Sequence, residues 1–171
     1  MEQEIINKVA NSGLVELNLE DFYTHGTRAD VDLKDQLFMG LILKEKDFRE
    51  WIKTHDWQQY QNKYVAVSCS ADAIIPVWAY MLVASQLSPV ANKVVLGNQT
   101  ELETILYHDA IQLLDVEQYA DQRIIIKGCG NLPVPESAYL MITAKLQPIA
   151  KSIMYGEACS TVPVYKQAKG N

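Results

Sequence analysis

Three cysteines, Cys69, Cys129 and Cys159, are the residues of this chain with the clearest potential for chemistry. Each is followed by a small residue and, four to seven positions later, by a proline, which is typical of a loop that leads into a new element. A position near a helix N-terminus favours the thiolate form, which binds metals and attacks electrophiles. An odd number of cysteines is unlike a disulfide framework, so we expect free thiols in a reducing compartment.

Two of the cysteines occupy corresponding places in the pattern of elements. Cys69 follows a β-branched run over 64–68, and Cys129 follows a similar run over 123–127. After each thiol comes a proline suited to the first turn of a helix. Because open α/β folds bind ligands at the carboxyl edge of a parallel sheet, we expect both thiols to project from such an edge.

The functional interpretation is one site built from all three thiols, with Asp72, Glu157 or a histidine as the fourth ligand. Three thiolates with one oxygen or nitrogen ligand suit zinc or an iron–sulfur cluster. The alternative is three unrelated thiols, because cysteine also behaves as a small buried hydrophobe. The cysteines lie 60 and 30 positions apart without a C-x-x-C pair, so no local zinc motif supports the site.

The first quarter of the chain is predicted to be rich in β-structure. Apolar and polar residues alternate over 15–20 and again over 29–33, which is the period of a half-buried strand. Residues 37–43 are apolar apart from Gly40 and predict a third strand, buried on both faces. The short connections between these runs favour an antiparallel unit at the N-terminus.

From residue 44 onward the pattern predicts alternating helices and strands. The helices are expected over 44–53, 76–87, 102–113 and 135–147, and the strands over 64–68, 93–97 and 123–127. Such alternation is typical of parallel strands joined by right-handed crossovers, with helices covering the sheet. No linker or shift in composition divides the chain, so we predict a single α/β domain over 1–171, in which the N-terminal β-unit extends or flanks the sheet.

Composition and charge exclude several classes of protein. The 171 residues are 49% hydrophobic and 21% charged, as in a globular chain rather than a disordered one. The net charge of −6 argues against nucleic acids and anionic membranes as partners. The longest apolar stretch without a charge, 73–84, is shorter than the about 20 residues of a membrane span. The acidic start of the chain is unlike a secretory signal, so we expect a cytoplasmic protein.

Enzyme motifs are weak in this sequence. The histidines show no H-x-x-x-H or H-E-x-x-H spacing, and neither G-x-G-x-x-G nor a P-loop occurs. Two alternatives to the metal site stay open. One is an enzyme with a single activated cysteine, Cys69 or Cys129, for thiol or sulfur transfer. The other is a non-catalytic adaptor with its cysteines in the core, and the almost uncharged segment 64–92 favours a homodimer that helps to bury it.

Four segments of the chain look familiar as a set, namely 32–35, 40–49, 69–76 and 151–157. Together they resemble a bacterial family classed as a domain of unknown function, over nearly the whole chain. Members of that family often lie beside genes of the sulfur-mobilisation pathway, so the resemblance implies iron–sulfur assembly proteins as partners. Scaffolds in such pathways hold clusters with three cysteines and an aspartate. The residues that match this ligand set by type are Cys69, Cys129, Cys159 and Asp72.

Overall fold

The computed structural model describes residues 13–128 and 130–168 of the chain. Its internal contacts divide the chain into two compact units. Unit 1 comprises Met1–Thr24 and Leu106–Asn171, and unit 2 comprises His25–Ile105. The second boundary falls inside helix α3 (Gln99–Gln112), so the chain passes from unit 2 to unit 1 within a continuous helix. The expectation of a single domain over 1–171 stays a prediction.

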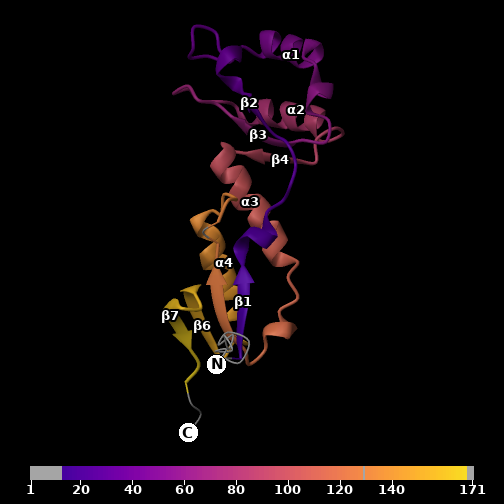
Figure 1. Cartoon of the computed structure of the whole chain (residues 1–171). Helices are drawn as coiled ribbons and strands as arrows, with labels where there is room; N and C mark the ends of the chain where they lie inside the picture. The colour runs from indigo at the N-terminus through magenta and orange to yellow at the C-terminus, as the bar shows by residue number, and fades with distance from the viewer. Residues whose placement is uncertain (1–12, 129, 169–171) are drawn as a thin grey trace, which may run out of the picture. The chain divides into compact units, whose positions relative to one another are not determined.

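Unit 2 is a parallel sheet with helices packed against it (Figure 1). The strands lie in the order β2-β3-β4, and each pairs with its neighbour in parallel. They are β2 (Arg28–Asp32), β3 (Tyr64–Ser68) and β4 (Lys93–Leu96), and the helices are α1 (Glu45–Thr54) and α2 (Val77–Leu87). Both helices bury one apolar face against the valines of β3, through Phe48, Ile52, Ala79, Val83 and Leu87.

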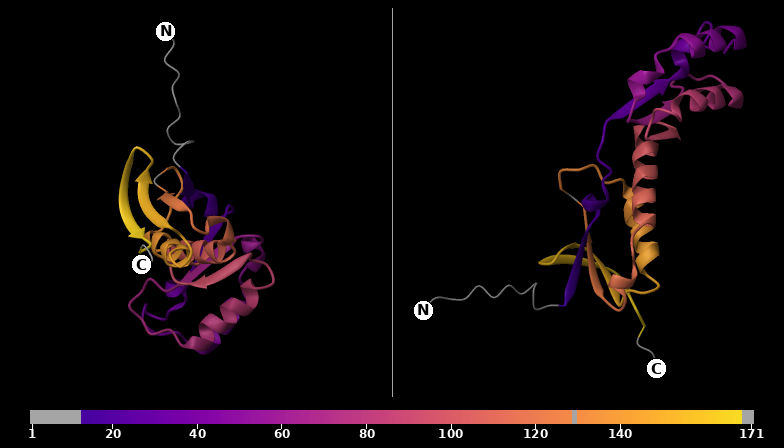
Figure 2. Two further views of the ribbon diagram at one scale, coloured as in Figure 1. Left: turned by 90° about the horizontal axis from the view of Figure 1, so that it is seen from below. Right: turned by 90° about the vertical axis from the view of Figure 1, so that its right-hand side faces the viewer.

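Unit 1 contains a second sheet, of four strands in the order β1-β5-β6-β7. The strands are β1 (Leu14–Asn18), β5 (Arg123–Lys127), β6 (Ser152–Glu157) and β7 (Ser160–Lys166), and the helix is α4 (Glu136–Leu146). β1, β5 and β6 are parallel, whereas β7 turns back from β6 and pairs with it antiparallel. This hairpin is the curved yellow pair of strands in Figure 2 (left). The residues that α4 buries against the isoleucines of β5 and β6 are Ala138, Ile142 and Leu146.

The two units are built on one residue pattern, which recurs after 59 positions. Moving 59 positions along the chain leads from the start of β3 to the start of β5, and from the start of α2 to the start of α4. The buried residues of α2 correspond in this way to those of α4. Identical residues also recur at this spacing, in the pairs Pro76/Pro135, Tyr80/Tyr139, Leu87/Leu146, Pro89/Pro148, Ala91/Ala150 and Gly97/Gly156.

The backbone repeats together with the residues. Asn62 and Asp121 lie 59 positions apart, and both have a positive φ, 58° and 55°. The N–H of Asn62 donates to the carbonyl of Val90 at 2.9 Å, and the N–H of Asp121 donates to that of Ile149 at 2.8 Å. Because asparagine and aspartate tolerate the left-handed region, the same turn chemistry leads the chain into β3 and into β5.

β1 and β2 form a shorter repeat, 14 positions apart. Asn18 ends β1 and Asp32 ends β2, and each side chain accepts a hydrogen bond of 3.1 Å from the N–H two residues later. The next residues, Leu19 and Leu33, are completely buried. β1 pairs with β5 and β2 pairs with β3 in corresponding registers. Each unit therefore combines one N-terminal strand with one copy of the strand–helix–strand repeat.

The predicted α/β class with a parallel core is confirmed, including the strands predicted over 64–68 and 123–127 and a slightly shorter one at 93–96. The predicted antiparallel unit at the N-terminus is wrong, because β1 and β2 lie in different sheets and each pairs in parallel. Alternating apolar residues indicate which face of a strand is buried but not the direction of its neighbour. The expected strand over 37–43 is also wrong. These residues form a tight loop with a single bridge between Phe38 and Ile42.

Candidate functional site

The two thiols that the structure describes lie in different units. Cys69 follows β3 in unit 2, where it is half-buried and its thiol donates to the carbonyl of Ala71 at 3.8 Å. Cys159 is exposed between β6 and β7 in unit 1. Cys129 lies outside the described residues. The adaptor hypothesis placed every cysteine in the core, and the exposure of Cys159 shows that this part of it is wrong.

Cys69 and Cys129 are expected at the same edge of one sheet because β3 and β5 are assumed to belong to the same sheet. This assumption is wrong. β3 belongs to the sheet of unit 2, whereas β5 belongs to the sheet of unit 1. Within residues 13–128 and 130–168, no group of three or more His, Cys, Asp or Glu side chains could hold a metal ion. Cys69 and Asp72 share one loop, but a site that also includes Cys129 and Cys159 stays a prediction.

A polar cluster lies at the carboxyl edge of the unit 2 sheet. Asp32 accepts hydrogen bonds from the N–H of Ser70 at 3.0 Å, from the hydroxyl of Ser70 at 2.6 Å and from the N–H of Lys34 at 3.1 Å. Burial opposes the charged form, but these bonds together outweigh it and hold the pKa of Asp32 below its usual value. Asp32 therefore remains an anion that ties the loop after β3 to the end of β2.

An apolar groove of 870 Å³ runs along α4 in unit 1, where the helix faces β6 and β7. Its apolar and aromatic wall includes Tyr139, Leu140, Ala144, Met154, Tyr155 and Val164. Its polar groups include Glu136, Thr143 and Gln147, all from α4 or its C-terminal cap. Leu140 is 73% exposed and Val164 is 52% exposed, so the wall is open to solvent. Covering such a surface is favourable by about 25 cal/mol per Å² of apolar area.

The spacing of residues on α4 explains why one side of this helix lines a groove. Ala138, Ile142 and Leu146 recur every four residues and face the core of unit 1. Tyr139 lies one position further on and is therefore turned by about 100° around the helix axis, toward the hairpin. Its ring contacts that of Tyr155 edge to face, with centroids 5.8 Å apart and planes at 75°. This aromatic pair connects the helix wall of the groove to the strand wall.

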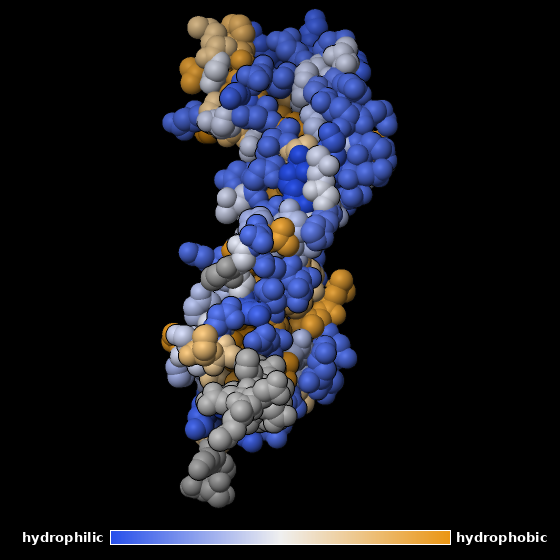
Figure 3. All heavy atoms as spheres, in the orientation of Figure 1, coloured by the Kyte–Doolittle hydropathy of each residue, from blue (hydrophilic) through white to orange (hydrophobic). Residues whose placement is uncertain are grey.

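A second apolar surface lies on unit 2, in the loop that precedes α1. Four of its side chains are between 46% and 80% exposed, namely Phe38, Met39, Leu41 and Ile42. In Figure 3, apolar residues gather at this loop. The Lys44 ammonium lies 3.2 Å from the centre of the Phe38 ring, a cation–π contact that holds one side of the loop. Exposed apolar side chains gathered in this way are typical of surfaces that contact another molecule.

The sequence pattern did not indicate the groove. The sequence predicts α4, but β6 and β7 form the other wall, and Pro163 within β7 argues against a strand. In the structure β7 is the edge strand of the sheet, where a proline is tolerated. Pro163 lies next to a register shift in the β6–β7 pairing. One signal lies in the 59-residue spacing, which sets the apolar segment 152–156 in register with the predicted strand over 93–97 and so predicts a strand there.

The comparisons with known proteins give a family. In the described part of the chain, no helix combines the length and the apolar character that crossing a membrane requires. Searches among curated proteins and among solved structures find no match. One family model matches residues 3–167, which is nearly the whole chain. The chain therefore belongs to the family described as "Protein of unknown function (DUF2480)".

Proposed function

We propose that this chain is a non-catalytic binding protein that holds an apolar segment of a partner protein in the groove of unit 1. The observation that carries the proposal is the groove itself, 870 Å³ in volume and walled by apolar and aromatic side chains of α4, β6 and β7. This proposal takes up the adaptor alternative that the sequence leaves open, without its core cysteines, and names the groove as the contact surface.

The openness of the groove favours a macromolecule over a small ligand. Small-molecule pockets enclose most of the surface of their ligand. Here Leu140 is 73% exposed and Tyr155 is 40% exposed, so the groove is open along its length. An amphipathic helix binds to such a surface by placing a row of apolar side chains in the groove. Glu136 lines the groove at the start of α4, where it would face a basic residue of the segment.

An uncharged apolar fluorophore, Nile red, tests whether the groove takes apolar groups in solution. We expect the wild-type protein to bind the dye, and Ala144→Arg to weaken binding at least about tenfold, a loss of about 1.4 kcal/mol, by filling the groove with a charged side chain. The matched control is Leu113→Arg, which places the same side chain on an 86% exposed position of unit 1 outside the groove. Equal dye binding by Ala144→Arg and wild type would contradict the proposal.

The role in iron–sulfur cluster assembly that the family resemblance implies stays a prediction, as do the thiol-enzyme alternative and the cytoplasmic location. The role in iron–sulfur cluster assembly requires zinc or a cluster held by Cys69, Cys129, Cys159 and Asp72. Elemental analysis of protein purified without oxygen or chelators tests this requirement. Near-stoichiometric zinc or iron that is lost in Cys129→Ser would support it, and metal-free protein that cannot be reconstituted would contradict it.

A further inference from the structure

The sheet of unit 2 ends at β4 in the part of the chain that the structure describes. In unit 1 the corresponding strand is β6, and β7 pairs with it on the side away from β5. The two copies of the repeat diverge after Gly97 and Gly156. Gly156 continues into the hairpin, whereas Gly97 leads into α3. No described strand of unit 2 therefore takes the place that β7 fills in unit 1.

We propose that β4 pairs antiparallel with β4 of a second copy of this chain, about a two-fold axis. The pairing joins two three-stranded sheets into one sheet of six strands. The antiparallel direction is the one that β7 adopts against β6 at the corresponding edge. Edge strands are templates for such additions, and a two-fold contact uses the same residues from both copies. The contact is separate from the groove of unit 1 and does not rest on the proposed function.

The hydrogen bonds of β4 select the register of this pairing. The N–H of Gly97 donates to the carbonyl of Val67 in β3 at 2.9 Å. Because bonding groups alternate in direction along a strand, Val95 also bonds toward β3, and the backbone groups of Val94 and Leu96 point to the open edge. A register with Val95 opposite its own copy sets Val94 opposite Leu96 of the second copy. This arrangement makes four N–H···O=C bonds across the two-fold axis.

A register centred one residue earlier is less favourable. With Val94 opposite its own copy, Leu96 would lie opposite Asn92 of the second copy. The N–H of Asn92 already donates to the carbonyl of Lys63 at 2.8 Å, so it is not available to the second copy. The register centred on Val95 uses only groups that point away from β3.

The charges on one face of the sheet fit the same register. Lys93, Val95 and Gly97 share that face because side chains alternate along a strand. A Cβ on Gly97 would lie 2.6 Å from the Cβ of Glu101, so the Glu101 side chain occupies the space beside Gly97. In the proposed register Lys93 lies opposite Gly97 of the second copy, next to the Glu101 of that copy. The two-fold axis produces this contact of opposite charges twice.

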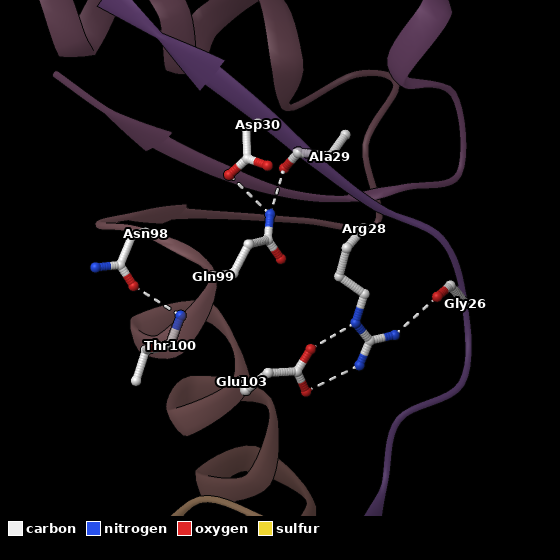
Figure 4. A network of polar contacts seen from close by, with 8 residues as sticks. All are labelled: Gly26, Arg28, Ala29, Asp30, Asn98, Gln99, Thr100 and Glu103. Carbon is white, nitrogen blue, oxygen red and sulfur yellow. Dashed lines mark hydrogen bonds and ion pairs between the residues drawn. The ribbon is translucent and has the colours of Figure 1, made fainter. Parts of the chain in front are cut away.

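The first turns of α3 are held against β2, which gives Glu101 a defined position. In Figure 4 the Gln99 amide donates to the carbonyl of Ala29 at 3.2 Å and to the carboxylate of Asp30 at 2.8 Å. One turn later Glu103 forms a two-pronged ion pair with Arg28, at 2.6 and 3.0 Å. These contacts fix the start of α3 relative to the sheet. The Glu101 carboxylate therefore has a defined position beside the edge strand β4.

The surface beside the edge is apolar and hollow. All four residues of β4 and the first turns of α3 line a hollow of 480 Å³. Leu96 is 64% exposed and Ile105 is 36% exposed at its rim. A strand added to β4 would cover this hollow and remove these side chains from water.

Sedimentation equilibrium of the full chain tests the pairing. We expect a mass of about twice the 19.3 kDa of one chain. Lys93→Glu should weaken the dimer at least about tenfold. The substitution sets a glutamate next to Glu101 of the second copy, and the two-fold axis produces this repulsion at two places. Glu101→Lys should weaken it in the same way, and the double variant should restore it. A chain that is monomeric at every concentration, or a dimer that Lys93→Glu leaves unchanged, overturns the proposal.

Amide hydrogen exchange tests the register independently of the mass. The amides of Val94 and Leu96 should exchange slowly in the wild-type dimer and fast in Lys93→Glu. The amides of Val95 and Gly97 bond to β3 and should stay protected in both, which shows that the variant is folded. The chain could instead be a monomer in which the amides of Val94 and Leu96 become protected only when an extended peptide is added. That result would show that β4 pairs with a strand of another protein and would overturn the proposal.

Discussion

At the residue scale, Asp32 joins two loops of unit 2 through three hydrogen bonds. Two of them come from Ser70 and one comes from the N–H of Lys34. Hydrogen bonds to a charged group contribute more than neutral ones, so Asp32→Asn should lower the free energy of unfolding at pH 7 by about 1–2 kcal/mol. Urea denaturation measures this change. Ser70→Ala, which removes one of the three bonds, should cost less.

The same carboxylate predicts a dependence on pH. Its folded pKa is lowered, because the hydrogen bonds of Ser70 and Lys34 together outweigh the effect of burial. A group with a depressed folded pKa stabilises the protein fully above its unfolded value of about 3.9, and this contribution is lost as the pH falls through the folded pKa. The difference between wild type and Asp32→Asn should therefore shrink between pH 5 and pH 3. A difference that persists unchanged at pH 3 contradicts the assignment.

Gly156 is a second single residue with a measurable role, because it allows the β6–β7 hairpin. Its φ is +117°, and a Cβ there would lie 2.5 Å from the carbonyl oxygen of Ser160. Gly156→Ala should cost about 1–3 kcal/mol of stability and weaken Nile red binding, since the hairpin is one wall of the groove. Gly40→Ala is the control. It has a positive φ of 71° but nothing within 4 Å, so only backbone strain of about 1 kcal/mol applies. Equal effects of the two substitutions on dye binding would contradict the role of the hairpin.

At the element scale, the sequence predicts the four helices and the parallel strands β3, β4 and β5, but not their division between two sheets. Periodicity shows which residues of a strand are buried, whereas the choice of neighbour depends on contacts between distant segments. The 59-residue recurrence indicates this division, because each unit contains one copy of the strand–helix–strand repeat. In that register Cys69 corresponds to Gly128, and Cys129 corresponds to Ser70, so the two thiols are not at equivalent positions. The groove could not be predicted because its second wall depends on β7, whose proline argues against a strand.

The end of α3 provides a prediction at this scale. The Lys145 ammonium donates to the last carbonyls of the helix, those of Ile111 at 2.7 Å and Gln112 at 2.6 Å. A cation at a helix C-terminus satisfies carbonyls that lack an intrahelical partner and interacts favourably with the helix dipole. Lys145→Met should therefore cost about 1–2 kcal/mol in urea denaturation. Lys151→Met, at an exposed position, should cost less than about 0.5 kcal/mol. Equal costs would exclude Lys145 as a cap.

At the scale of the whole molecule, the prediction of a single domain can be tested through the tryptophans. All three tryptophans, Trp51, Trp57 and Trp78, lie in unit 2, so their fluorescence reports the unfolding of that unit. Leu146 is completely buried in the core of unit 1, and Leu146→Ala should cost about 2–5 kcal/mol. If the shared helix α3 couples the units into one cooperative domain, this substitution shifts the fluorescence midpoint. An unchanged midpoint, with a second transition in circular dichroism, would show that the units unfold separately.

The central claim, that the groove of unit 1 binds a partner protein, is tested most directly by cross-linking in cells. A photo-reactive amino acid in place of Leu140, in the groove, is compared with the same amino acid in place of Leu113, an exposed position outside it. We predict a discrete cross-linked product from position 140 that is absent from position 113 and lost when Ala144→Arg is added. The captured protein, once purified, should bind the wild-type chain and not Ala144→Arg. Equal products from both positions, or equal binding by wild type and Ala144→Arg, would contradict the claim.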